Sequence, residues 1–251
     1  MVQVLIEDPG LARHLSGREL AQATAVAIAP LMRVAPGTRR FLVNEPWTYG
    51  HLGLLVLDGL IARYVTVGQI AATEFLGPRD ILAPWVSPRE HAEPLQVRWE
   101  VLAPSRLASL DEQFGRRIGP WPQIPAALLD RAAQRADAQV LQAALRQARR
   151  VEDRVLLALW HFAGRWGHVG PEGRTVSLPK ITGETLARVI GARRQSVSTA
   201  LGQLVQRGAI ERHADGSLTV PSEPPQLRPV QREAIVTEAP AVARRATDQH
   251  W

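Results

Sequence analysis

The stretch "ITGETLARVIGARRQSVSTALGQLVQRGAI" (Ile181–Ile210) predicts two short helices joined by a tight turn. Gly191 separates the two helical patterns, and glycine adopts the backbone of such a turn at the least steric cost. Thr182 is placed to cap the first helix. Apolar residues recur at helical spacing on both sides of the glycine: Leu186, Val189 and Ile190 before it, and Val197, Leu201, Leu204 and Val205 after it. The stretch therefore predicts a helical pair with one buried face on each helix.

The second predicted helix begins with a polar cluster: Arg193, Arg194, Gln195, Ser196, Ser198 and Thr199. In a DNA-binding helix–turn–helix unit, this end of the second helix enters the major groove. Arginine can pair with guanine and glutamine with adenine, whereas serine and threonine contact phosphates. We therefore expect Arg194 and Gln195 to read bases, and the other members to contact phosphates or base edges. Thr182 and Lys180 are expected to contact the DNA backbone.

The alternative for the same pattern is a helical hairpin whose polar face is only solvated. Two flanking segments favour the DNA-binding interpretation. "TVSLP" (Thr175–Pro179) predicts a strand before the pair, and "ERHADGSLTV" (Glu211–Val220) predicts a hairpin that turns at Asp215-Gly216. Together with the helices, these strands predict a winged helix–turn–helix domain.

The composition favours an anionic partner and excludes several chemistries. The 251 residues carry a net charge of +6, and Lys180 is the only lysine among 30 basic residues. Arginine's forked donors suit phosphates and guanine, although a codon bias toward arginine explains the shortage of lysine equally well. The chain has no cysteine, which excludes disulfides, thiolate catalysis, cysteine-ligated zinc and iron–sulfur clusters held by cysteine.

No constellation in the sequence is typical of an enzyme, a metal site or a cofactor site. The histidines of "REHAE" (Arg89–Glu93), and the pair His161 and His168, lack the spacing of a helical zinc motif. Phosphate-cradling glycine loops, nucleophile elbows and paired-carboxylate motifs are also missing. The sequence therefore predicts a protein that is not an enzyme and that holds neither metal nor cofactor.

The sequence pattern of the first half of the chain is typical of an antiparallel β-structure. A helical pattern from Gly17 to Ile28 comes first, and short apolar runs bounded by Gly, Pro, Asn and Asp then recur from Leu31 to about Asp111. Such runs predict an antiparallel sandwich or roll. Asp58-Gly59 and Gly68 are the strongest turn signals.

A long helix is predicted from Ala126 to Gln147, after the proline-bounded segment "GPWPQIP". One set of its apolar residues steps by four and three, the period of a coiled-coil seam: Leu129, Ala133, Ala136, Val140 and Ala143. A second apolar edge comprises Leu128, Ala132, Leu141 and Leu145. Two edges require two neighbours, and we expect these to be the helix's own domain and a twin helix in a homodimer. The alternative is a helix buried within one domain.

The remaining segments complete a four-part organisation. "VEDRVLLALWHFAGRWG" (Val151–Gly167) predicts another helix, which follows a hinge near Arg149–Asp153. The expected parts are a sensor-like sheet domain over 1–122, the dimerisation helix over 123–150, the winged domain over 151–222 and a disordered tail over 223–251. No apolar run has transmembrane length and no signal peptide is evident, so we expect a cytoplasmic protein without a membrane partner.

The helical pair also resembles a known family. The matching residues are Leu186-Ala187, Ile190-Gly191, Arg194-Gln195-Ser196-Val197-Ser198-Thr199-Ala200-Leu201, Leu204 and Gly208-Ala209-Ile210. In type and spacing they resemble the C-terminal domain of the Crp/Fnr superfamily, which includes the cyclic-AMP receptor protein. "EDRVLLALW" (Glu152–Trp160) and, more weakly, "LGLLVLDGLIARY…EFLGPRDIL" (Leu52–Leu82) are similar to other parts of that family.

The resemblance implies an α+β protein with an N-terminal antiparallel β-roll of the cyclic-nucleotide-binding kind, a long dimerisation helix and a C-terminal winged helix–turn–helix. It implies a dimeric transcription regulator that binds double-stranded DNA, with RNA polymerase as a further candidate partner. Gln195 and Thr199 depart from the family's usual glutamate and second arginine. Glutamine both donates and accepts hydrogen bonds, so we expect the preferred half-site to differ from the family's usual one.

The effector is left open by the sequence. In the cyclic-nucleotide branch of the family, the Gly-x-x-Asp segment is followed by a Gly-Glu pair that binds the ribose and by an Arg-Ser or Arg-Thr pair that binds the cyclic phosphate. Here Ala83-Pro84 stand in place of the Gly-Glu pair, and Arg98 is about one residue away from the position of the family's arginine. Cyclic AMP is therefore disfavoured as a ligand. Another small ligand, a cyclic dinucleotide bound elsewhere, and no ligand all stay possible. Arg98, Arg89 and Trp85 are the ligand-binding candidates. The alternative function is a sensor module that answers such a ligand mainly through protein contacts.

Overall fold

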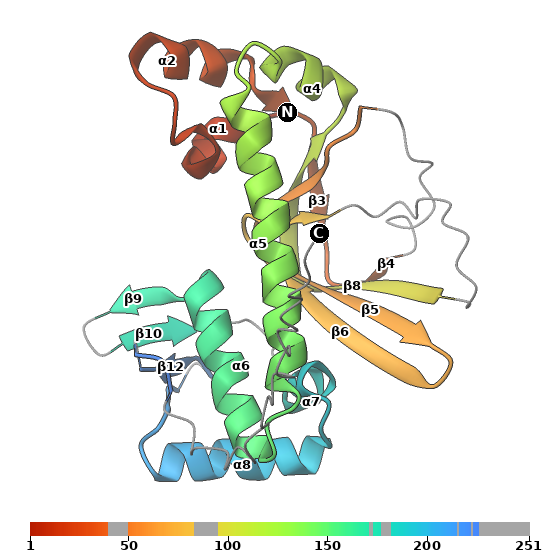
Figure 1. Ribbon diagram of the computed structural model, residues 1–251, viewed down its shortest axis with the longest axis vertical. Helices are drawn as coiled ribbons and strands as arrows, with labels where there is room; N and C mark the ends of the chain where they lie inside the picture. Colours follow the sequence, from red (N-terminus) through yellow and green to blue (C-terminus); the bar gives the residue numbers. More distant parts are fainter. Residues whose placement is uncertain are drawn as a thin grey trace, which may run out of the picture.

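The computed structural model describes residues 1–39, 50–82, 95–170, 173–176, 182–214, 216–221 and 223–225. Its helices are α1 (Val4–Glu7), the 3-10 helix η1 (Pro9–Ala12), α2 (Gly17–Val26), α4 (Glu112–Ile118), α5 (Gln123–Leu145), α6 (Val151–Trp166), α7 (Gly183–Ile190) and α8 (Arg194–Gln206). α5 runs along most of the length of the molecule, with the long strands on one side of it and α6 at its lower end (Figure 1). The predicted helices are thus confirmed within a few residues at their ends.

The strands form three antiparallel sheets. They are β1 (Val2–Gln3), β2 (Ile28–Ala29), β3 (Leu31–Val34), β4 (Gly37–Arg39), β5 (Gly53–Val67), β6 (Ile70–Leu76), β7 (Ile81–Leu82), β8 (Leu95–Leu110), β9 (His168–Gly170), β10 (Gly173–Val176), β11 (Glu211–Arg212) and β12 (Leu218–Val220). The largest sheet has the order β3-β8-β5-β6, with β4 on β8 and β7 on β5. We call this sheet the roll. The wing sheet has the order β11-β12-β10-β9, and β1 pairs with β2.

The predicted turn at Asp58-Gly59 is wrong. β5 continues through both residues as one strand of 15 residues, and its pairing with β8 is irregular on both sides of Asp58. Gly59 has a φ of 98°, and a Cβ placed there would lie 2.1 Å from the Ser105 Oγ and 2.6 Å from the Pro104 carbonyl oxygen. The Asp-Gly pair therefore marks a bulge where β8 approaches the backbone of β5. The predicted turn at Gly68 is confirmed, between β5 and β6.

The roll's own apolar core is filled by its side chains. Trp99, which is 2% exposed, packs in this cluster with the following residues: Val34, Leu54, Val56, Ile61, Leu76, Leu82, Val101 and Leu107. The N-terminal helices form a separate core with α4 and the start of α5, through residues such as Leu11, Phe114 and Ile124. The buried members of the first core all lie on strands, whereas the second core joins the N-terminal helices to the roll and to the start of α5.

The apolar seam predicted on α5 is exposed along its whole length. Leu129 and Val140 expose 72% and 70% of their surface, and Ala133, Ala136 and Ala143 are exposed as well. The second apolar edge is only partly correct, because Leu128 is buried and Leu145 half-buried, whereas Ala132 and Leu141 are exposed.

Ion pairs, rather than a continuous apolar edge, hold α5 to the rest of the chain. Arg131 forms two bonds of 2.6 and 2.8 Å to the buried Asp8 carboxylate, and Arg135 forms two of 2.7 and 2.9 Å to Glu74. Burial by itself would raise the pKa of Glu74, but the bonds from Arg135 hold that pKa below its ordinary value. None of the helices in the described ranges is long and apolar enough to span a membrane.

Candidate nucleic-acid interface

The turn between α7 and α8 is built by local contacts. The Thr182 side chain accepts a hydrogen bond from the Thr185 N–H at 3.2 Å and so caps α7. Gly191 ends α7 in the left-handed conformation, with a φ of 66°, and the Ala192 N–H donates to the Ala187 carbonyl oxygen. This is the helix end that glycine favours. The predicted cap and turn are both confirmed.

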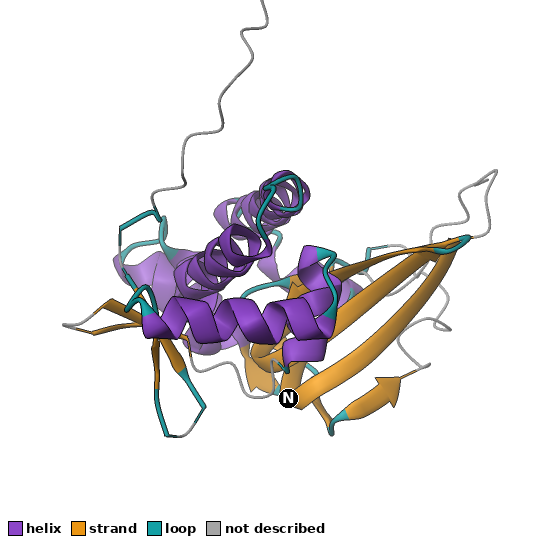
Figure 2. Ribbon diagram, turned by 90° about the horizontal axis from the view of Figure 1, so that it is seen from below, coloured by secondary structure: helices purple, strands orange, loops and turns teal. Residues whose placement is uncertain are grey.

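The inner face of α7 is as predicted, whereas that of α8 is only partly so, because Leu201 is half-buried and Val205 is 40% exposed. Leu186, Val189 and Ile190 of α7 are buried, as are Val197 and Leu204 of α8. Because these faces are anchored in the core, the opposite face of α8 is held toward solvent. α8 crosses the front of the molecule when it is seen from below (Figure 2). The structure therefore presents one whole side of α8 to a partner.

The polar cluster lies at the start of this exposed side. Its exposed members are Arg193, Arg194, Gln195, Ser198 and Thr199, and Ser196 is half-buried. Thr199 donates its hydroxyl proton to the Gln195 carbonyl oxygen at 3.1 Å, so toward DNA its hydroxyl can act only as an acceptor. Thr182 is exposed, and Lys180 lies outside the described residues.

The wing brings a further basic residue to the same side. Arg212 of β11 is exposed, and together with Thr182, Ser198 and Gly202 it lines a groove of about 530 Å³ between α8 and the wing. The predicted hairpin is confirmed by the antiparallel pairing of β11 with β12, while Asp215 of its turn lies outside the described residues. Our sequence interpretation missed Arg212, although its place in the first strand of the wing was a usable signal.

The roll and the C-terminal helices share one apolar core. Its members from the roll include Leu60, Ala62, Tyr64, Phe75 and Ala103, and those from the helices include Val155, Leu159, Phe162, Leu186, Val189, Val197 and Leu204. α5 adds a polar link, because Arg146 donates to the Val189 carbonyl oxygen at 2.8 Å and so pairs a carbonyl at the end of α7. The position of α8 is therefore set by the roll and α5 as well as by its own domain.

Of the residues predicted to bind a ligand, the structure describes Arg98 alone. Arg98 lies on β8 at the interface with the C-terminal domain, 4.1 Å above the Tyr64 ring and 3.2 Å from the Glu100 carboxylate. Its charge is thus already paired. Arg89 and Trp85 lie outside the described residues, as do Ala83 and Pro84 and the tail from residue 226 onward.

His161 of α6 makes the stability of this arrangement sensitive to acid. Burial, helped by the charge of Arg165, lowers the pKa of His161 to about 4 from its ordinary value near 6.5. Because the unfolded chain takes up this proton first, stability falls as the pH drops through the interval between these two values.

We expect a loss of about 2 kcal/mol in the free energy of unfolding between pH 7.5 and pH 5. A His161→Gln variant should lose less stability over that interval, whereas His14→Gln, at an exposed histidine, should behave like the parent. Thermal unfolding at the two pH values measures this, and equal losses in the parent and His161→Gln would contradict it.

Comparison with known proteins agrees with this geometry. Residues 153–227 match the family model of the Crp-like helix-turn-helix domain. No curated protein matches the chain. The match confirms the predicted winged helix–turn–helix and points to a regulator rather than an enzyme.

Solved structures share this fold over most of the chain at low sequence identity. A cyclic nucleotide-binding domain containing protein from Listeria monocytogenes EGD-e is 18% identical, with a TM-score of 0.59 and coverage of 76% of this chain and 88% of that one. FixK2 from Bradyrhizobium japonicum is 16% identical, with a TM-score of 0.58 and coverage of 77% and 92%. A CooA mutant from Carboxydothermus hydrogenoformans is 16% identical, with a TM-score of 0.57 and coverage of 88% and 91%. These likenesses confirm the predicted fold class.

Proposed function

We propose that this chain, a DNA-binding regulator of the Crp/Fnr type by its Crp-like helix-turn-helix domain and its fold, works as a homodimer that reads duplex DNA with Arg194 and Gln195. The observation that carries the proposal is the exposed start of α8, whose opposite face is anchored in the core. An exposed arginine and glutamine at this end can pair bidentately with guanine and adenine edges in the major groove.

The other exposed polar residues position the duplex. Arg193, Ser196 and Ser198 contact phosphates or base edges, and Thr182 and Lys180 contact the backbone. Thr199 acts as an acceptor, since its proton is used within α8. Arg212 of the wing adds a phosphate contact next to Ser198, which is supported by the groove that both residues line. Such contacts fix the register of the protein on the duplex without reading its sequence.

Dimerisation places two copies of α8 on one duplex. The exposed apolar seam of α5 supports this step, because five residues at coiled-coil spacing have no partner within the described part of the chain. A twin α5 packed on the seam would cover them. Two recognition helices then address half-sites about 34 Å apart, one turn of the duplex. A regulator of this kind acts in the cytoplasm and works on RNA polymerase.

The described part of the roll does not favour a cyclic-AMP site. Its interior is occupied by Trp99 and the aliphatic side chains around it. Arg98, the arginine nearest to the family's phosphate ligand in sequence, is paired with Glu100 at the outer interface. These observations support a degenerate effector domain that does not bind cyclic AMP in the usual way.

An Arg194→Ala variant tests the base-reading role. Loss of one bidentate contact should weaken binding to the preferred duplex by about 1–3 kcal/mol and relax specificity at one base pair. The measurement is selection from a randomised duplex pool, followed by titration of the selected duplex at several salt concentrations. Arg116→Ala, at an exposed arginine of α4 far from α8, is the matched control. An unchanged sequence preference in Arg194→Ala would remove this residue from the reading set.

A further inference from the structure

The lower end of α5 meets α6 and α7 (Figure 1), and side chains from this region bind the end of α7. The Val189 carbonyl oxygen accepts a hydrogen bond of 2.8 Å from the Arg146 Nε and a longer one of 3.5 Å from the Gln142 Nε2. The Gly191 carbonyl oxygen accepts one of 3.5 Å from the Arg154 Nη1. Arg146 directly follows α5, and Arg154 lies near the start of α6. The end of α7 is therefore held from both sides of the connection between α5 and α6, and most closely by Arg146.

The charge of Arg146 is balanced by a helix end and not by a carboxylate. Arg146 is half-buried, and burial lowers the pKa of its guanidinium. No carboxylate in the described ranges forms an ion pair with it. The last carbonyl groups of a helix carry partial negative charge, so the end of α7 supplies the counter-charge. Because a charge removed from water is costly unless it is hydrogen-bonded, Arg146 favours arrangements in which the end of α7 stays within its reach.

The end of α7 leads directly into the DNA-reading end of α8. Only a three-residue turn (191–193) separates the two helices, and the left-handed Gly191 and the bond from the Ala192 N–H to the Ala187 carbonyl oxygen fix its shape. On the other side, the exposed seam residue Val140 comes less than two turns of helix before Arg146. One side chain thus connects the seam of α5 to the start of α8.

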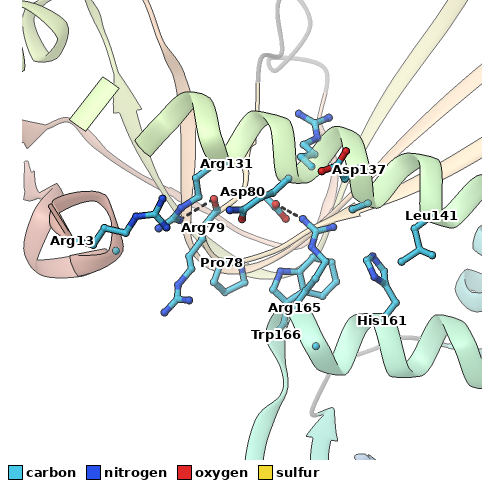
Figure 3. A pocket seen from close by; sticks show the side chains of 15 residues that line it. Arg13, Pro78, Arg79, Asp80, Arg131, Asp137, Leu141, His161, Arg165 and Trp166 are labelled. Atoms are coloured by element: carbon cyan, nitrogen blue, oxygen red, sulfur yellow. Dashed lines mark hydrogen bonds and ion pairs between the residues drawn. The ribbon is translucent and has the colours of Figure 1, made fainter. Parts of the chain in front are cut away.

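α5 and α6 are attached to the roll by contacts of their own. Arg165, near the end of α6, pairs with Asp80 in the turn between β6 and β7 (Figure 3). Gln142 of α5 donates to the Thr73 carbonyl oxygen of β6 at 2.8 Å. Loss of the Arg146 side chain would leave these contacts in place and would remove the short polar bond between α5 and α7. Such a change should move α8 without unfolding the chain.

We propose that Arg146 is a positioning residue, which sets the start of α8 relative to the seam of α5 and thereby the spacing of half-sites that a dimer accepts. The part of this proposal that involves DNA rests on the proposed function. When two α5 helices pack on their seams, each Arg146 fixes the distance from the shared interface to its own α8. A dimer with both bonds intact then presents two reading ends at one separation. Without the bonds each α8 can shift, and several spacings become acceptable.

The bond can be tested without DNA, because the chain contains no cysteine that would take up a spin label. Labels on Gln134→Cys of α5 and Gln203→Cys of α8, both at exposed positions, report the distance between the two helices by pulsed electron paramagnetic resonance. The labelled chain is mixed with an excess of unlabelled chain, so that a dimer carries one labelled pair at most. We expect a narrow distance distribution in the parent and a broader one in Arg146→Met. Arg116→Met, which removes a charge from an exposed position of α4, should leave it narrow.

Duplexes then test the spacing of the half-sites. Two selected half-sites are placed at the spacing that the parent prefers, and with one base pair added or removed. The preference of the parent for its own spacing should fall about tenfold or more in Arg146→Met, since the second half-site no longer requires one geometry. The affinity for a duplex with a single half-site should stay unchanged, because the bond lies outside the reading face of α8.

An unchanged distance distribution in Arg146→Met would overturn the proposal, and so would an unchanged spacing preference in a protein that binds two half-sites. Equal effects in Arg116→Met would indicate a response to net charge alone, which also overturns it. An equal loss of affinity for the single half-site would indicate damage to the winged domain and would overturn the positioning role as well. A parent that binds no duplex would reject the proposed function, and the distance measurement would still decide on Arg146.

Discussion

Replacing Leu129 and Val140 together by aspartate is expected to make the protein monomeric and to lower its affinity for a duplex with two half-sites by at least about 100-fold. Both side chains are largely exposed on the seam of α5, so the substitutions should not disturb the fold of the isolated chain. In a dimer, however, the four introduced carboxylates would be desolvated against one another. The avidity that comes from binding two half-sites at once would then be lost.

Analytical ultracentrifugation gives the oligomeric state of this variant, and titration with duplexes of one and two half-sites gives the loss of avidity. Ile6→Asp is the control, since Ile6 is 59% exposed on α1 and lies outside the seam. It should remain dimeric and bind like the parent. A double variant that stays dimeric would exclude the seam as the interface, and a monomer with full affinity would exclude the dimeric mode of reading.

The second large effect concerns stability. Gly59→Ala should lower the free energy of unfolding by about 3–5 kcal/mol. The new Cβ meets the Ser105 side chain and the backbone of β8 at once, and the backbone at this position already has a φ that side chains rarely adopt. Neither strand can move freely, because β5 and β8 pair along most of their length.

Gly68→Ala separates the two causes. Gly68 also has a positive φ, of 56°, but a Cβ there would meet nothing within 4 Å. We expect it to cost only the backbone strain, about 1–2 kcal/mol. Thermal and denaturant unfolding of both variants measures the difference. Similar costs for the two variants would mean that the close approach of β8 to Gly59 does not matter to stability.

The helix–turn–helix could be predicted almost completely from the sequence. Its determinants are close neighbours along the chain, such as the Thr182 cap, the left-handed Gly191 and the apolar residues repeated at helical spacing. Interactions within one or two turns of helix depend little on the rest of the molecule. For the same reason the apolar seam of α5 could be predicted, since its five residues share one face of one helix.

The Asp-Gly signal at Asp58-Gly59 failed for the opposite reason. The pair is compatible with a turn or with a bulge, and the choice depends on the strand that lies beside it. That strand is β8, which reaches the site with Ser105 and Pro104. No local pattern near Gly59 carries this information. The exposed Ala132 and Leu141 were misjudged in the same way, because Arg131 and Arg135 take up the contacts of α5 with the rest of the chain.

The sequence by itself thus determined the class of the C-terminal domain, and it supplied the predictions of which residues read DNA and on which helix two copies pair. Only the tertiary structure decided how that domain is held against the roll and which residues meet at the joint between the roll, α5 and α6. Asp80 and Arg165 meet across the joint between the roll and α6, and so do Gly77 and Trp166. Such contacts join residues far apart in the chain, and they exist only once packing has brought both sides together, so the spacing of residues does not encode them.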